Sequence, residues 1–288
     1  MSGSSRVQFA ASGVVVALSL CATLTWALLR KRNPLRFVYA TGAVSPERYA
    51  ALAAAPGWRR WNVRLSDGVV LHGLIRRPAR PEAPWILFYP GNDAAQLATG
   101  QAAVAAVIGA DDWGGAVIAY RGFDGSGGTP HIARLRTDGL EIYDALRAAE
   151  QLSAAQVHLS AFSIGGNIAT YVAGQLAKRD APAASLSLMA SVYDIVMVRP
   201  SILSRLDPGD ALQTLPFLAA VPAPVLVLTG SADDALNGTT QARAIATALD
   251  TRARYVELAG VKHAELLSTA AALDVVHAFV AAHLAPAR

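Results

Sequence analysis

The chain has 288 residues, of which 53% are hydrophobic and 16% are charged. This composition excludes an intrinsically disordered chain, which combines low hydrophobicity with high charge. The single cysteine, Cys21, excludes an internal disulfide framework and a cysteine-based metal cluster. The net charge is +4, and no basic stripe with interleaved aromatic residues is present, so the sequence does not favour nucleic-acid binding.

The first long apolar run covers residues 7–29 and contains no charged side chain. It exceeds the roughly 20 helical residues that cross the hydrocarbon core of a bilayer. Basic residues follow at 30–32 and a helix-ending Pro34 comes next, so residues 1–36 are interpreted as a single-pass membrane anchor. Basic residues after the span favour a cytoplasmic location for the rest of the chain. The alternatives are a cleaved signal peptide, which would need a small-residue cleavage site here, a lipoprotein signal at Cys21, and a buried core helix.

Residues 37–57 are expected to connect this anchor to the remainder of the chain. Within the connector, Ser45 followed by Pro46 predicts the capped start of a short helix. Farther on, Asp67 and Gly68 separate two apolar-rich segments, which predicts an antiparallel hairpin.

Short apolar runs then alternate with alanine-rich segments of helical length. The runs, each expected to be a strand, cover residues 84–90, 115–120, 156–162, 184–190, 224–230 and 254–260. Continuous apolar strands that alternate with helices predict a mainly parallel sheet with helices on both faces. No linker divides residues 58–288, so the sequence predicts one α/β domain there.

The strand that begins at Val157 leads directly into Ser163, and a helix is expected to begin just after it. A serine on such a sharp turn exposes its hydroxyl, provided that the residues two positions away are small. Ala161 and Gly165 meet that condition. The backbone N–H of Ile164, near the helix N-terminus, could then stabilise an oxyanion. The alternative interpretation is that Ser163 is an ordinary helix N-cap.

Further polar residues follow the ends of other expected strands. Gly91 and Asn92 follow one strand, where the N–H of Asn92 could be a second oxyanion donor. Asp233 and His263 follow the last two strands. Serine needs a base to become a nucleophile, and a carboxylate would orient the imidazole that supplies it. The predicted site therefore contains Ser163, Asp233 and His263.

About residues 60–285 resemble the α/β-hydrolase superfamily, especially its monoglyceride-lipase-like and serine-aminopeptidase-like branch. The chain order of serine, aspartate and histidine matches that of the superfamily. The segment YRGFDGSGGTP at 120–130 resembles the Y-R-G-x-G-x-S-x-G loop of that branch, and GSADD at 230–234 and GVKH at 260–263 resemble its acid and histidine turns. Pro90 replaces the histidine usual before Gly91, and Ala161 replaces a glycine. The resemblance implies an α/β-hydrolase fold and a serine hydrolase.

Several residues compete for these roles. Asp234 adjoins Asp233, although the spacing of the motif favours Asp233, and Asp194 is a further candidate acid. Ser126 lacks the strand-to-helix context, so we interpret it as part of a turn. The apolar segment 191–220 suits a short lid over an acyl pocket, or else an ordinary excursion that packs on the core.

The expected function is the cleavage of carboxylic esters or thioesters through an acyl-enzyme, with a lipid or another acyl-bearing molecule as a possible substrate class. Two alternatives stay open: an amide-cleaving peptidase, and a non-catalytic scaffold or binding protein with a hydrolase fold. No metal-binding spacing such as H-E-x-x-H occurs, so neither a metal nor a cofactor is expected. The sequence predicts no oligomeric state.

Overall fold

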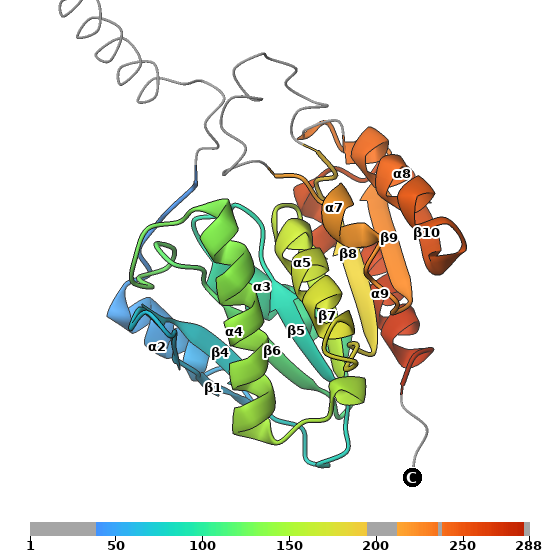
Figure 1. The fold of residues 1–288 in the computed structure, drawn as a ribbon. Coiled ribbons are helices and arrows are strands. Elements are labelled where there is room, and N and C mark those ends of the chain that lie inside the picture. The colour runs from blue at the N-terminus through green and yellow to red at the C-terminus, as the bar shows by residue number, and fades with distance from the viewer. Residues whose placement is uncertain (1–38, 195–211, 236–237, 285–288) are drawn as a thin grey trace, which may run out of the picture. The chain divides into compact units, whose positions relative to one another are not determined.

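The computed structural model describes residues 39–194, 212–235 and 238–284 (Figure 1). The predicted span at residues 7–29 and the central part of the predicted lid, residues 195–211, lie outside this set. By its internal contacts the chain divides into Met1–Val38 and Tyr39–Arg288. None of the helices in the described ranges is both long enough and apolar enough to cross a membrane.

The described residues contain one large sheet, with strand order β1-β4-β6-β5-β7-β8-β9-β10. Its strands are β1 (Trp58–Arg60), β4 (Gly73–Arg76), β5 (Trp85–Tyr89), β6 (Gly114–Ile118), β7 (Val157–Phe162), β8 (Ser185–Met189), β9 (Val225–Gly230) and β10 (Ala253–Leu258). The strands from β5 to β10 run parallel to one another, whereas β4 pairs antiparallel with both β1 and β6. All six predicted parallel strands are therefore confirmed.

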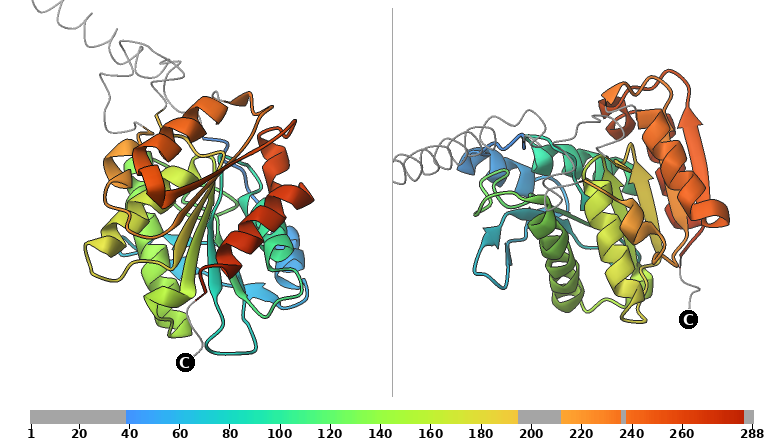
Figure 2. Two further views of the ribbon diagram at one scale, coloured as in Figure 1. Left: turned by 90° about the vertical axis from the view of Figure 1, so that its right-hand side faces the viewer. Right: turned by 45° about the horizontal axis from the view of Figure 1, so that its top comes forward.

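Helices cover both faces of this sheet (Figures 1 and 2). Helices α3 (Gln96–Ile108) and α9 (Ala270–Ala281) pack together on one face. The other face carries α4 (Ile132–Glu150), α5 (Gly165–Ala177), α7 (Leu215–Leu218) and α8 (Gly238–Leu249). Short 3₁₀ helices are η1 (Ala154–Gln156), η5 (Asp250–Arg252) and η6 (Ala264–Leu267). Strands β5 to β9 are buried throughout, which explains their continuous apolar sequences.

The predicted hairpin forms around Asp67 and Gly68, and its second arm divides into two strands. Strand β2 (Val63–Arg64) pairs antiparallel with β3 (Val70–Leu71) in a separate small sheet. After His72, the chain enters β4 and joins the central sheet. The division places the turn of the hairpin outside the large sheet.

The described part of the connector packs against the domain. Helix α2 (Pro46–Ala53) begins as predicted, because the hydroxyl of Ser45 accepts a hydrogen bond from the N–H of Arg48. Tyr49 is buried, and its hydroxyl donates to the carbonyl of Gly73 at 2.8 Å. The described part of the connector therefore belongs to the folded unit.

The loop that begins at Tyr120 depends on a buried arginine. Arg121 Nε and Nη2 lie 2.6 and 2.7 Å from the two carboxylate oxygens of Asp138 on α4, and Nη1 lies 3.0 Å from Asp67. The hydrogen bonds to Asp138 and Asp67 hold the pKa of Arg121 above its ordinary value. The hydroxyl of Ser126 accepts from the N–H of His72 and donates to the carbonyl of Ala119, which confirms its role in the turn.

Candidate active site

Ser163 occupies the turn between β7 and α5. Its φ angle is 54°, a left-handed conformation that non-glycine residues rarely adopt. The N–H of Ser163 donates to the carbonyl of Met189 at 2.9 Å, so the turn is tied to the end of β8. Only 6% of the residue is exposed. The predicted strand–serine–helix arrangement is therefore present, with a strained backbone at the serine.

Close packing explains why the residues that flank Ser163 are small. A β-carbon on Gly165 would lie 2.1 Å from the carbonyl oxygen of Tyr89, which is far inside van der Waals contact. Ala161 pairs with Tyr89 in the β5–β7 register and is fully buried. The first turn of α5 consequently packs directly on the end of β5.

The same packing brings the turn after β5 next to the serine. A β-carbon on Gly91 would lie 2.7 Å from Cδ1 of Phe162 and 3.4 Å from Cβ of Ser163. Asn92 follows immediately, so its backbone belongs to the same short turn. The two predicted oxyanion donors, Asn92 and Ile164, thus come from the two segments that flank the serine.

Hydrogen bonds from Gln96, Tyr120 and Ala40 hold this turn in place. Gln96 Nε2 donates to the carbonyl of Gly91 at 2.8 Å, and Gln96 Oε1 accepts from the N–H of Tyr120 at 2.9 Å. The hydroxyl of Tyr120 donates to the carbonyl of Pro90 at 3.0 Å. The side-chain oxygen of Asn92 accepts from the N–H of Ala40 at 2.7 Å. Sequence reasoning missed Gln96 and Ala40, because no motif marks either residue.

The backbone N–H of Ile164 points out of the N-terminus of α5. It donates no hydrogen bond within the described part of the chain. An N–H group at this place in a helix is an unused donor, and the helix dipole adds partial positive charge there. The group is therefore suited to an oxygen that becomes negatively charged beside Ser163.

Asp233 and His263 meet beyond the ends of β9 and β10. Nδ1 of His263 lies 3.0 and 2.9 Å from the two carboxylate oxygens of Asp233. The Asp233 side chain is fully buried, whereas that of His263 is partly exposed. The N–H of Ala235 also donates to Asp233 at 3.1 Å. Asp234, the competing candidate, is exposed.

The ring of Phe162 connects this pair with the serine. Its centroid lies 4.7 Å from that of the His263 ring, and Phe162 immediately precedes Ser163 in the chain. The Ser163 hydroxyl and His263 share no hydrogen bond in the described part of the chain. Hydrogen bonds of this kind often tighten only when substrate is bound.

Asp194, the other candidate acid, lies after β8 and is held elsewhere. Its backbone N–H and carbonyl both bond to the side chain of Gln241, at 2.9 and 3.1 Å. The carboxylate that contacts His263 in the structure is that of Asp233. Across the described residues, no cluster of three or more histidine, cysteine or acidic side chains could hold a metal ion.

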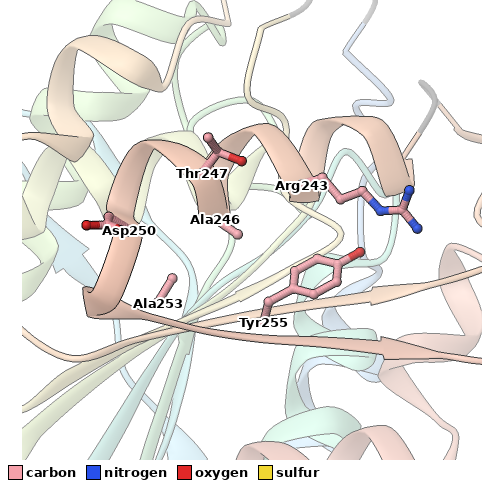
Figure 3. A pocket seen from close by; sticks show the side chains of 6 residues that line it. All are labelled: Arg243, Ala246, Thr247, Asp250, Ala253 and Tyr255. Atoms are coloured by element: carbon pink, nitrogen blue, oxygen red, sulfur yellow. The ribbon is translucent and has the colours of Figure 1, made fainter.

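A separate hollow of about 630 Å³ lies between α8 and β10 (Figure 3). Arg243, Asp250 and Tyr255 are among the residues that line it. Arg243 forms an ion pair with Glu257 at 2.9 Å. Neither Ser163 nor His263 lines this hollow, so it is not part of the candidate active site.

Solved structures with similar folds align with most of the chain. An α/β-hydrolase from Vibrio vulnificus aligns with a TM-score of 0.67 at 15% identity, covering 84% of this chain and 87% of that protein. An esterase from Pyrococcus furiosus gives a TM-score of 0.65 at 10% identity, covering 86% and 97%. The chain has the α/β-hydrolase fold. Esterase 2 from Thermogutta terrifontis, in a form phosphoramylated by tabun, aligns at 20% identity with a TM-score of 0.62, covering 81% and 97%.

Relatives in sequence come from Mycobacterium tuberculosis. An uncharacterized protein of strain CDC 1551 is 27% identical over 277 residues, which are 92% of each chain. An uncharacterized protein of strain H37Rv is 30% identical over 169 residues, covering 56% of this chain and 57% of that protein. No protein-family model matches the chain.

Proposed function

We propose that this protein is a serine hydrolase that cleaves carboxylic esters or thioesters through an acyl-enzyme. Ser163 is the nucleophile, His263 is the general base, and Asp233 orients the imidazole and stabilises its charged form. The backbone N–H groups of Asn92 and Ile164 stabilise the oxyanion of the tetrahedral intermediate.

The observation that carries this proposal is the strained Ser163 turn next to the Gly91 turn, with the His263–Asp233 pair in contact with Phe162. Strained non-glycine residues concentrate at functional sites, because the surrounding structure must maintain them. The esterases among the structures of similar fold support ester cleavage rather than a purely structural role. The motifs from Tyr120 to Pro130 favour the monoglyceride-lipase-like and serine-aminopeptidase-like branch of the superfamily.

The chemistry assigned to these residues follows from their contacts. His263 uses Nδ1 for Asp233, so Nε2 is the ring atom left to accept the proton of the Ser163 hydroxyl. The serine oxygen then attacks the carbonyl carbon, and the carbonyl oxygen takes the negative charge. Collapse of this intermediate expels the alcohol or thiol, which receives the proton from His263. Water later releases the acid by the same steps.

The proposal includes a membrane anchor at residues 7–29 and a catalytic domain on the cytoplasmic face, and both rest on the sequence alone. An anchored hydrolase with an apolar segment at 191–220 suits lipid or other acyl substrates of modest size. Retention of the full-length protein in membrane pellets after carbonate washing is the expected result for an anchored chain.

The experiment that tests the function measures the hydrolysis of p-nitrophenyl esters of graded acyl length by the full-length protein in detergent. We expect hydrolysis of one or more of these esters, and the loss of several orders of magnitude in kcat in Ser163→Ala. Ser126→Ala is the matched control, because the Ser126 hydroxyl is committed to the turn. Equal activity of Ser163→Ala and the unchanged protein would contradict the proposal.

A further inference from the structure

The segment of residues 39–44, which immediately precedes the capped helix α2, runs across the turn that carries Asn92. The N–H of Ala40 donates to the side-chain oxygen of Asn92 at 2.7 Å. The two residues are 52 positions apart in the chain, so this is a tertiary contact and not a local turn. We call residues 39–44 the brace segment.

A second contact shows how closely the brace segment fits this turn. A β-carbon on Gly42 would lie 2.8 Å from the carbonyl oxygen of Ala94 and 3.1 Å from its Cβ. A real β-carbon almost never approaches a backbone oxygen so closely, so only glycine allows this approach. At the start of the segment, the ring of Tyr39 meets that of Phe123 edge-on, with centroids 6.3 Å apart.

The contact with Ala40 affects the proposed oxyanion donor through Asn92 itself. The backbone N–H and the side chain of Asn92 share one α-carbon, so a fixed side-chain oxygen limits how the peptide at Asn92 can turn. Gln96 and Tyr120 hold the carbonyls of Gly91 and Pro90 on the preceding part of the turn. Donors of this kind work only when placed to within about 0.5 Å of the productive geometry.

We infer that the brace segment is part of the catalytic apparatus, with Ala40 and Gly42 as positioning residues for the N–H of Asn92. The inference rests on the proposed function. In chain order the brace segment follows the predicted anchor, so the chain that would tether the enzyme to a bilayer is also the chain that holds its oxyanion turn.

The test compares Ala40→Pro with the unchanged full-length protein in detergent. Proline has no N–H, so the hydrogen bond to Asn92 is lost while the backbone and side chain of Asn92 are retained. We expect kcat to fall on the order of tenfold with KM little changed, because the loss affects the transition state and not substrate binding. The affinity for a trifluoromethyl ketone, which forms an oxyanion adduct with serine, should fall by a similar factor.

Two further variants separate positioning from general disturbance. Gly42→Ala should give the same pattern as Ala40→Pro, because the added methyl group pushes the brace segment away from Ala94. Ser45→Ala is the matched control: Ser45 lies just outside the brace segment, and its hydroxyl accepts from the N–H of Arg48 at the start of α2. It should keep the unchanged kcat.

Three outcomes would overturn the inference. One is an unchanged kcat in both Ala40→Pro and Gly42→Ala. Another is an equal loss in Ser45→Ala. The third is a rise in KM alone. Labelling of the unchanged protein at Ser163 by a fluorophosphonate tests the proposed function separately. If Ser163 is not labelled, both the proposed function and the role of the brace segment are contradicted. If Ser163 is labelled and kcat is unchanged in the variants, only the role of the brace segment is contradicted.

Discussion

The backbone conformation of Ser163 is maintained by the residues around it. Its φ of 54° costs on the order of 1–3 kcal/mol for a residue with a side chain. The bond from its N–H to Met189 and the packing of Gly165 on Tyr89 keep the turn in that conformation. The small residues around the serine could be recognised in the sequence, because a sharp turn excludes larger ones. The hydrogen bond from Ala40 to Asn92 could not, because it joins residues that carry no shared pattern.

The choice between Asp233 and Asp234 gives a prediction at the same scale. Asp233→Asn keeps the size of the side chain but removes the carboxylate that contacts His263, so kcat should fall by roughly 10⁴-fold. Asp234→Asn should stay close to the unchanged protein, because Asp234 is exposed. Steady-state kinetics on one p-nitrophenyl ester measures both variants. A larger loss in Asp234→Asn would show that the acid has been misassigned.

Among the elements, β7 and β8 contain polar side chains inside an otherwise apolar sheet. His158 on β7 is fully buried and lies opposite Ser185 of β8, with Nδ1 2.8 Å from the Ser185 hydroxyl. Among the described residues, Nε2 of His158 has no hydrogen-bond partner. Burial lowers the pKa of His158 to about 4, with a smaller contribution from His283. The imidazole is therefore neutral in the folded protein at pH 7.

This burial predicts how stability depends on pH. The unfolded chain protonates His158 near pH ~6.5, whereas the folded chain does so only near pH 4, so the unfolded state binds more protons between these values. The free energy of unfolding should therefore be fully retained above about pH 6.5 and should fall by about 2–3 kcal/mol as the pH drops to 4.5. Urea unfolding of the protein and of His158→Gln at both pH values measures this contribution as a difference. Identical losses in the two proteins would exclude His158 as its source.

The strands could be predicted from the sequence where burial on both faces requires a continuous apolar run. Strands β5 to β9 are covered on both sides, and each appears in the sequence as an uninterrupted apolar run. The arm after the hairpin turn was harder to predict. Strands β3 and β4 form one continuous apolar-rich segment in the sequence, but in the structure they belong to different sheets and are divided at His72. The buried ion pair of Arg121 with Asp138 also needed the structure, since neither residue type is normally buried.

For the whole molecule, the α/β-hydrolase fold brings the ends of β5, β7, β9 and β10 to one edge of the sheet. Ser163, Asp233 and His263 are up to 100 residues apart in the chain, yet the parallel topology carries them to that edge. The order of the strands in the sheet cannot be obtained from the apolar pattern of single strands. The predicted anchor at residues 7–29 stays a prediction, because it lies outside the described residues.

The most direct test of the central claim, that Ser163 is a catalytic nucleophile, is covalent labelling of the full-length protein with a fluorophosphonate, followed by mass spectrometry of its peptides. The account predicts one adduct, on Ser163, that is absent in Ser163→Ala and forms more slowly in Asp233→Asn, because the serine then lacks an oriented base. No adduct on the folded protein, or an adduct on another serine that persists in Ser163→Ala, would contradict it.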